Sequence, residues 1–333
     1  MDYVRMGRTG LKVSSLAFGT MSFGGYADEA ESARMFAVCR DAGINTFDCA
    51  DVYNGGRSEE ILGKLAAGCR DELILTTKAY FPSGPGPNDR GSSRRHLVHS
   101  VERSLGRLGT DRIDLFFLHR FDDGTPLEET LRAVNDLIGQ GKILYYAVSN
   151  FSAWETMKAV GIAQQHGWAA PVCTQPMYNL AKRQAEVEIL PMAQSEGLGV
   201  LPYSPLGGGL LTGKYAPGVR PAVGRIVETA MYGTRYGAAI NYEIAERFSA
   251  LAHEIGHHPA AVAVAWVASH PAVTAPLLGA RNVAQLRDAL GASDVPMTDE
   301  LRGRICGLSP SPPPATDRNE EGSAASYQNA LKR

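Results

Sequence analysis

The sequence predicts an α/β protein whose strands and helices close into a (β/α)8 barrel of the TIM type. Short apolar runs alternate with amphipathic stretches along most of the chain, which is typical of a parallel sheet whose strands are joined by helices. Eight such units follow one another, and this number favours a closed barrel over an open doubly wound sheet. We therefore expect one domain over residues 1–333, with residues 308–333 as a Pro-rich and then polar C-terminal tail.

The elements can be assigned in chain order. Residues 3–13 hold a Gly-x-Thr-Gly turn between two short alternating stretches and predict a β-hairpin. The eight strands are expected at residues 16–19, 44–48, 73–77, 113–119, 143–149, 172–175, 199–203 and 273–278. The helices are expected at residues 32–42, 58–67, 93–108, 126–139, 153–166, 184–196, 242–256 and 282–290. Two long segments, 79–92 and 215–240, follow strands and would lie at the C-terminal face, where such barrels build their active sites.

Composition and charge exclude several classes of protein. The 33 basic and 35 acidic residues leave a net charge of -2, so there is no electrostatic case for binding nucleic acid or an anionic membrane. The longest apolar run, residues 260–268, is far shorter than the ~20 residues of a membrane helix. No secretory signal is evident at the N-terminus, and the five cysteines are dispersed. We expect a cytoplasmic protein with reduced thiols.

Polar side chains stand at the ends of three successive predicted strands. Asp48 ends the first of them, Lys78 follows the second and His119 ends the third, while Tyr53 lies in the loop after Asp48. Because parallel strands end at one face, we expect these four side chains to meet in one pocket. A nearby ammonium lowers the pKa of a tyrosine, and a carboxylate keeps that ammonium oriented. The set predicts proton transfer, with Tyr53 as general acid or base and His119 directed at a carbonyl oxygen.

Seven motifs occur in an order that resembles the aldo-keto reductase superfamily. They are residues 43–53 (GINTFDCADVY), 57–63 (RSEEILG), 76–78 (TTK), 114–119 (DLFFLH), 148–151 (VSNF), 175–179 (QPMYN) and 203–210 (YSPLGGGL). The resemblance extends from about residue 3 to residue 290, and its details are similar to the branch of bacterial oxidoreductases and potassium-channel β-subunits. It implies that Tyr53, Lys78, Asp48 and His119 are the catalytic residues. It also implies that homo-oligomers occur in this branch, although the sequence does not locate an interface.

The resemblance further implies a nicotinamide cofactor, NADP(H), bound without the strand–Gly-x-Gly-x-x-Gly–helix fingerprint, which this chain lacks. By this likeness Ser149, Asn150 and Gln175 hold the carboxamide, and Tyr203 stacks on the nicotinamide ring. The segment that wraps the pyrophosphate contains Ser204, Leu206, Gly208 and Lys214. Arg281, at the start of a helix, binds the 2′-phosphate. Gln285 and Asp288 contact the adenosine. The other expected cofactor contacts are Gly19, Thr20, Asp48, Tyr53, Pro205, Arg225 and Gly279.

Two short motifs point elsewhere. Residues 253–257 read His-Glu-Ile-Gly-His, a zinc-protease pattern, but no third ligand follows and Pro259 limits a helix there. Residues 208–214 fit Gly-x4-Gly-Lys, yet Tyr215 replaces the Ser or Thr that would hold magnesium. We predict no metal site.

The sequence therefore predicts an NADPH-dependent reductase of an aldehyde or ketone, with Tyr53 as proton donor and with a small carbonyl or alcohol as its partner. Two alternatives stay open: a redox-sensing module that holds NADP and turns over slowly, and an NADP-dependent dehydrogenase of a sugar or secondary-metabolite alcohol. Arg120 after His119 either favours a polar or anionic substrate or only pairs with Asp122.

Overall fold

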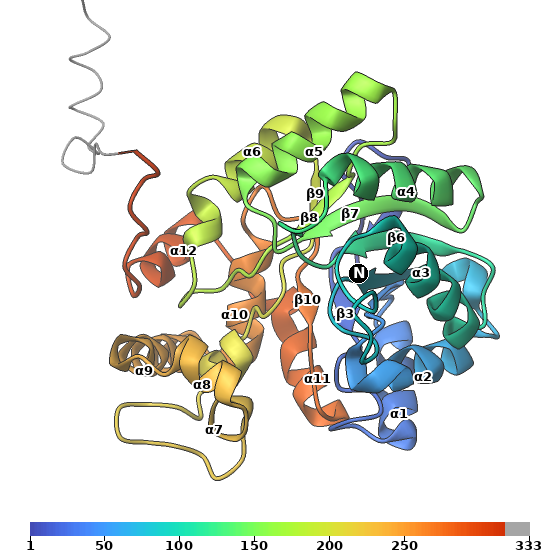
Figure 1. The fold of residues 1–333 in the computed structure, drawn as a ribbon. Coiled ribbons are helices and arrows are strands. Elements are labelled where there is room, and N and C mark those ends of the chain that lie inside the picture. The colour runs from blue at the N-terminus through green and yellow to red at the C-terminus, as the bar shows by residue number, and fades with distance from the viewer. Residues whose placement is uncertain (317–333) are drawn as a thin grey trace, which may run out of the picture.

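The structure, a computed structural model, describes residues 1–316; the part of the predicted tail over residues 317–333 lies outside them. Eight parallel strands form the centre of the molecule, and helices surround them (Figure 1). The strands are β3 (Ala17–Gly19), β4 (Thr46–Asp48), β5 (Ile74–Ala79), β6 (Ile113–Leu118), β7 (Ile143–Ser149), β8 (Cys173–Gln175), β9 (Gly199–Val200) and β10 (Leu277–Leu278). They are ordered β10-β3-β4-β5-β6-β7-β8-β9. The predicted (β/α)8 barrel is confirmed.

The two ends of this sheet are joined by hydrogen bonds between the chain around β9 and the chain before β10. The Ala275 N–H donates to the Val200 carbonyl at 3.2 Å, and the Leu277 N–H donates to the Pro202 carbonyl at 2.9 Å. The Val200 N–H also donates to the Thr274 hydroxyl at 2.9 Å. This seam closes the sheet on itself, so the carboxyl ends of all eight strands surround one opening.

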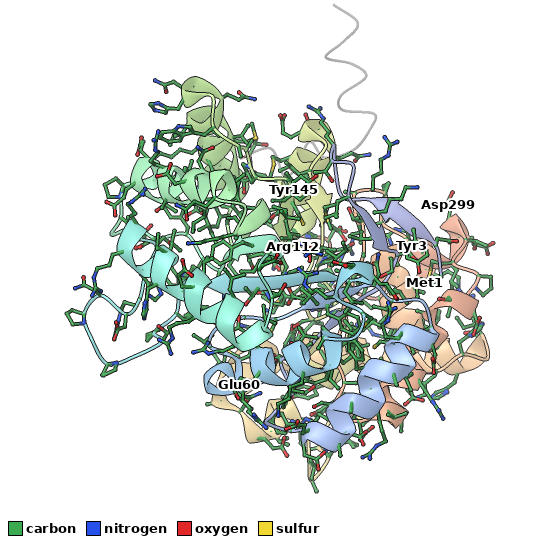
Figure 2. All side chains as sticks on the ribbon, turned by 90° about the vertical axis from the view of Figure 1, so that its right-hand side faces the viewer. Met1, Tyr3, Glu60, Arg112, Tyr145 and Asp299 are labelled. Atoms are coloured by element: carbon green, nitrogen blue, oxygen red, sulfur yellow. The ribbon has the colours of Figure 1, made fainter. Side chains whose placement is uncertain are left out.

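Twelve helices lie in the described part of the chain. They are α1 (Glu29–Asp41), α2 (Arg57–Ala66), α3 (Arg94–Leu108), α4 (Leu127–Gly139), α5 (Ala153–His166), α6 (Ile189–Glu196), α7 (Arg225–Glu228), α8 (Ala230–Tyr236), α9 (Ala239–Glu254), α10 (Pro259–Ala268), α11 (Val283–Leu290) and α12 (Asp299–Cys306). Side chains pack into the space between this layer and the strands, where most of the apolar core lies (Figure 2).

Several predicted elements differ from the observed ones: β9 (Gly199–Val200) and β10 (Leu277–Leu278) are shorter than expected, α12 was not expected, and three further differences have local reasons. The helix expected at 184–196 is split into a 3₁₀ turn and α6. The segment 215–240 contains α7 and α8, which carry no long apolar period. Helix α10 was not predicted, because Pro259 reads as a stop signal; in the structure it occupies the first turn of α10, where its missing N–H costs nothing. His258 caps that turn by accepting from the Ala260 N–H.

The predicted hairpin is confirmed as β1 (Tyr3–Arg5) and β2 (Lys12–Ser14), and it covers the N-terminal end of the barrel. Met6 and Val13 join an interior cluster with Leu115 and Phe117 of β6. Met1 and Tyr3 lie together on this hairpin, away from Glu60 on α2 (Figure 2). The barrel is therefore plugged at this end and open only at the other.

Candidate active site

Asp48 and Lys78 form a buried ion pair at the ends of the neighbouring strands β4 and β5. The Lys78 ammonium donates to the Asp48 carboxylate and to the Cys49 carbonyl, the latter over 2.6 Å. The second Asp48 oxygen accepts from the Thr76 hydroxyl at 2.7 Å and from the Gln175 amide at 3.0 Å. A buried carboxylate with three donors is held in one position, and it holds its lysine in turn.

Tyr53 opens a 3₁₀ turn just after β4, and Lys78 Nζ lies 5.2 Å from the centre of its ring. The sequence predicts that Lys78 lowers the pKa of this phenol, and that prediction was wrong. The pKa of Tyr53 is raised well above 10, first because the surrounding protein desolvates the phenolate and then because Asp48 repels it. The positive charge of Lys78 is already balanced by Asp48. Tyr53 is therefore a protonated phenol at neutral pH.

His119 follows β6 directly and is 8% exposed. Its ring packs edge-on against Phe81, at 4.8 Å between centres, and against Tyr53 at 6.1 Å. Burial, and next the charge of Lys78, holds its pKa well below 6.5. The ring is thus neutral and carries a single N–H. Its Nδ1 is buried without a hydrogen-bond partner in the described structure.

The face above these residues contains a cavity of about 1160 Å³, large enough for an extended ligand and a second small molecule. All but two of the residues named from the sequence line it. These are Gly19, Asp48, Tyr53, His119, Ser149, Asn150, Gln175, Tyr203, Ser204, Pro205, Leu206, Gly208, Lys214, Arg225, Gly279, Arg281, Gln285 and Asp288. Lys78 lies beneath the wall. Thr20 is fully buried, and its hydroxyl donates to the Asp48 carbonyl at 3.0 Å and pairs with Ser58.

Asn150 is the centre of the polar set on the far side of the cavity. Its φ of 56° is in the left-handed region, as is the φ of 58° at Ser204, and such strain in residues other than glycine is concentrated at functional sites. Its amide donates to the His119 carbonyl at 2.9 Å and accepts from the Tyr203 hydroxyl at 2.7 Å. Asn150 thereby connects the loop that carries His119 to the aromatic ring expected beside the nicotinamide.

The opposite end of the cavity is cationic. Lys214, Arg225 and Arg281 all line it, and burial together with the charges of Arg281 and Arg225 lowers the pKa of Lys214. Three like charges in a partly buried site repel one another, and a bound anion would relieve that repulsion. Arg281 is already oriented: it pairs with Glu228 at 2.6 Å and lies 3.7 Å from the centre of the Tyr26 ring.

The start of α11 offers less to a phosphate than the sequence indicates. The Val283 N–H donates to the Glu31 carboxylate of α1 at 2.7 Å. The Gln285 N–H donates to Asn282, the capping residue, at 3.0 Å. Since two of the first backbone donors of this helix are occupied, an anion at this end depends mainly on the guanidinium of Arg281.

Comparison with known proteins decides the family. The profile of the Aldo/keto reductase family matches residues 15–309, nearly the whole barrel and the start of the tail. The chain belongs to this family.

Its relatives within the Aldo/keto reductase family have two kinds of description. The chain is 39% identical to "Uncharacterized oxidoreductase YrpG" of Bacillus subtilis, covering 94% of this chain and 97% of the relative. It is 38% identical to "Probable voltage-gated potassium channel subunit beta" of Arabidopsis thaliana, covering 89% and 92%. A protein of Schizosaccharomyces pombe with a similar description is 36% identical, covering 90% of each chain. The resemblance noted from the motifs, branch included, is confirmed.

Several cavity residues of this aldo/keto reductase were not identified from the sequence. Phe81 and Phe121 come from the loops after β5 and β6, and Met231, Tyr232 and Arg235 come from α8. The apolar period that marks strands and helices does not extend into these segments. One signal was available: aromatic and basic residues are concentrated in segment 215–240 at the face where ligands bind.

The zinc-protease pattern is not built as a metal site in this reductase fold. Helix α9 ends at Glu254, and Gly256 takes a φ of 75°, so His253 and His257 do not share a helix face. Glu254 pairs with Arg304 of α12 at 2.7 Å. Within residues 1–316, no group of three His, Cys, Asp or Glu side chains is gathered around a common point. A search of the same residues finds no helix with the length and apolarity needed to cross a membrane.

Proposed function

We propose that this protein is a cytoplasmic, NADP(H)-dependent oxidoreductase that reduces an aldehyde or ketone to an alcohol, reversibly, with Tyr53 as the proton donor. The observation that carries the proposal is the arrangement of a protonated Tyr53 and a neutral, unpartnered His119 beside the fixed Asp48–Lys78 pair. Both rings line the same cavity. These two groups, an O–H and an N–H, can both reach a carbonyl oxygen there.

Each residue has a separate task in this mechanism. The N–H of neutral His119 donates a hydrogen bond to the carbonyl oxygen and orients it. The phenol of Tyr53 gives its proton to that oxygen as negative charge develops, and the nearby Lys78 ammonium offsets only part of the cost of the buried phenolate that remains. Asp48 holds Lys78 close to the ring. In alcohol oxidation the same groups act in reverse. The same site would therefore also suit an NADP-dependent dehydrogenase that oxidises a sugar or secondary-metabolite alcohol.

The cavity residues fit an NADP dinucleotide. When bound, this cofactor supplies the hydride that the side chains cannot. Ser149, Asn150 and Gln175 would hold the nicotinamide end beside Tyr203. Lys214 and Arg225 would bind the pyrophosphate, and Gly208 lets the backbone approach it. Arg281 would bind the 2′-phosphate, which favours NADP over NAD.

The direct test is NADPH and NADH consumption with a panel of aromatic and aliphatic aldehydes, comparing the wild type with Tyr53→Phe. Removal of a general acid costs about 10²–10⁴-fold in rate, so turnover should collapse while NADPH still binds. Tyr80→Phe is the matched control, because Tyr80 lies against Phe81 but is not part of the cavity wall. Equal turnover in the wild type and Tyr53→Phe would contradict the assignment of the proton donor.

A second candidate function is a redox-sensing module that holds NADP(H) and turns over slowly. Relatives described as potassium-channel β-subunits favour it, as does the Arg281–Glu228 pair, which ties segment 215–240 to the adenosine end of the cavity. The discriminating measurement is cofactor release by stopped-flow fluorescence. Release much slower than turnover on every carbonyl would favour the sensor; rapid release with useful turnover would favour the reductase.

A further inference from the structure

The outer part of the cavity has a composition that carbonyl reduction alone does not require. Phe81 and Phe121 on one side and Val223 and Met231 on the other line it with apolar surface. Met231 is 49% exposed and Val223 is 62% exposed. Exposed apolar groups at the mouth of a pocket mark the position of a ligand's apolar body.

Arg235 extends this wall with a positive charge. It lies on α8, half-buried, with its guanidinium 5.4 Å from the centre of the Tyr232 ring. Tyr232 is 5% exposed and packs against Tyr236, which fixes the ring under the guanidinium. Within residues 1–316 no carboxylate pairs with Arg235. Stacking on a fixed ring orients an arginine while leaving its N–H donors free.

A second cation, Arg120, comes from another part of the rim. It directly follows His119, is exposed and lines the same cavity. The expected pairing with Asp122 is absent from the described part of the chain. The Asp122 carboxylate accepts instead from the Ser92 N–H at 2.6 Å and from the Thr125 hydroxyl at 2.8 Å. In strand order β6, which precedes Arg120, is well separated from β9 and β10, which flank α8.

Two carboxylates, Glu155 and Asp123, line the same cavity as these two guanidiniums. Glu155 lines the cavity, but its carboxylate accepts from the Ser152 N–H at 2.7 Å. Asp123 is exposed on the outer rim and forms no ion pair within residues 1–316. Lys214 and Arg225, which lies over the same Tyr232 ring as Arg235 at 5.7 Å from its centre, are assigned to the cofactor. Two guanidiniums and two carboxylates thus line this part of the cavity, and within residues 1–316 Arg235 forms an ion pair with neither carboxylate.

We propose that the substrate is a carbonyl compound with an apolar body and a carboxylate remote from the carbonyl, with the carboxylate held by Arg235. This inference rests on the proposed function and specifies its substrate class. A guanidinium matches a carboxylate with two parallel N–H donors. Phe81, Phe121 and Met231 contact the apolar body, and the carbonyl end reaches Tyr53 and His119.

The test compares acids with their neutral esters. The substrates are 4-formylbenzoate and 4-formylphenylacetate, which differ in length, each against its methyl ester, with saturating NADPH. For at least one pair, kcat/KM of the acid should exceed that of the ester by roughly ten- to a hundredfold, the usual effect of charge-assisted hydrogen bonds. In Arg235→Ala that ratio should fall about tenfold or more. Arg235→Lys keeps the positive charge but loses the paired N–H donors of the guanidinium. Its acid-to-ester ratio should therefore lie between those of the wild type and Arg235→Ala.

Arg220→Ala is the control, because Arg220 belongs to the same segment and stacks on Tyr242, outside the cavity wall. It should leave the ratio unchanged. The inference is overturned if the wild type reduces esters as well as acids, or if Arg235→Ala leaves the acid-to-ester ratio unchanged. Either result leaves the proposed reductase function standing. If no aldehyde is reduced, the proposed function fails instead. Calorimetry of the NADP-loaded protein with 4-(hydroxymethyl)benzoate and its methyl ester then decides the inference, because equal affinities would refute it.

Discussion

Asp51 is a buried carboxylate two positions before Tyr53. It is 3% exposed, and neither of its oxygens has a hydrogen-bond partner in the described structure. Burial and the charge of Glu59 raise its pKa to about 7, although Arg107 acts in the opposite direction. Arg107 donates to the Asp51 carbonyl and to Glu59, each over 3.0 Å. This network supports the turn on which Tyr53 lies, so Asp51 affects the free energy of folding close to the reaction centre.

The sign of its effect follows from linkage. Because the pKa of Asp51 is about 7 in the folded protein and 3.8 for an unperturbed aspartate, its contribution to stability is fully present below about pH 4 and is lost as pH rises through about 7. An asparagine at position 51 does not ionise, so Asp51→Asn does not lose stability in this way as the pH rises. The variant should gain stability relative to the wild type from pH 4 to 7, with no further gain above. Urea unfolding at pH 4.5, 6 and 8 measures the difference. Exposed Asp41→Asn is the control, and a constant difference between wild type and Asp51→Asn would contradict the prediction.

Helix α8 contributes several residues to the wall of the cavity. Its Tyr232 ring packs against Gly208 of the pyrophosphate segment, and a Cβ at Gly208 would lie 2.6 Å from that ring. Arg235 on the same helix lines the cavity, while Glu228 of the adjoining α7 pairs with Arg281, the residue proposed to bind the 2′-phosphate. One short segment, 225–236, thus lines the cavity and holds the partner of Arg281 (Figure 1, yellow).

Substitution of Gly208 by alanine should therefore weaken NADPH binding by about tenfold or more, because the new methyl group displaces Tyr232 and α8. The φ of 67° at Gly208 adds strain of about 1–2 kcal/mol. Gly218→Ala is the matched control: it has a similar φ of 74° but nothing within 4 Å of a Cβ. NADPH fluorescence titration gives both Kd values. Equal weakening in the two variants would mean that strain alone, not contact with α8, is responsible.

At the scale of the whole molecule, the hairpin closes the barrel and leaves a single opening. Gly7, in its turn, has a φ of 55° and lies directly against the backbone at the barrel's N-terminal end. A Cβ there would be 2.7 Å from the Gly197 carbonyl oxygen and 2.9 Å from that of Val172. These are backbone atoms of the barrel and cannot move aside as a flexible side chain can.

Gly7→Ala should consequently destabilise the whole fold, by about 1–3 kcal/mol for the overpacking in addition to about 1–2 kcal/mol for the left-handed backbone. Gly141→Ala, with a φ of 72° and open space around it, should cost only the second amount. Urea midpoints of both variants against the wild type provide the measurement. If the two variants unfold at the same midpoint, the hairpin turn does not press on the barrel as the distances indicate.

By itself the sequence determined the barrel, the hairpin and the convergence of Asp48, Tyr53, Lys78 and His119 at one face. Alternating apolar periods are local, and strand ends in a parallel barrel share one face, so the positions of Asp48, Lys78 and His119 follow from strand boundaries alone. The motif order also predicted about half of the residues that line the cavity. Only the tertiary structure decided the pKa values of these groups. Proximity to Lys78 predicts a lowered pKa for Tyr53, but burial raises it, so the phenol stays protonated.

The tertiary structure alone also decided which residues from distant segments pair with the residues of the cavity. Glu228 pairs with Arg281, and Glu31 of α1 occupies the start of α11. The short helix α8 brings Tyr232 and Arg235 into the cavity. The physical reason is the same in each case: these contacts join residues far apart in the chain, through loops whose conformation follows from packing and not from any local period.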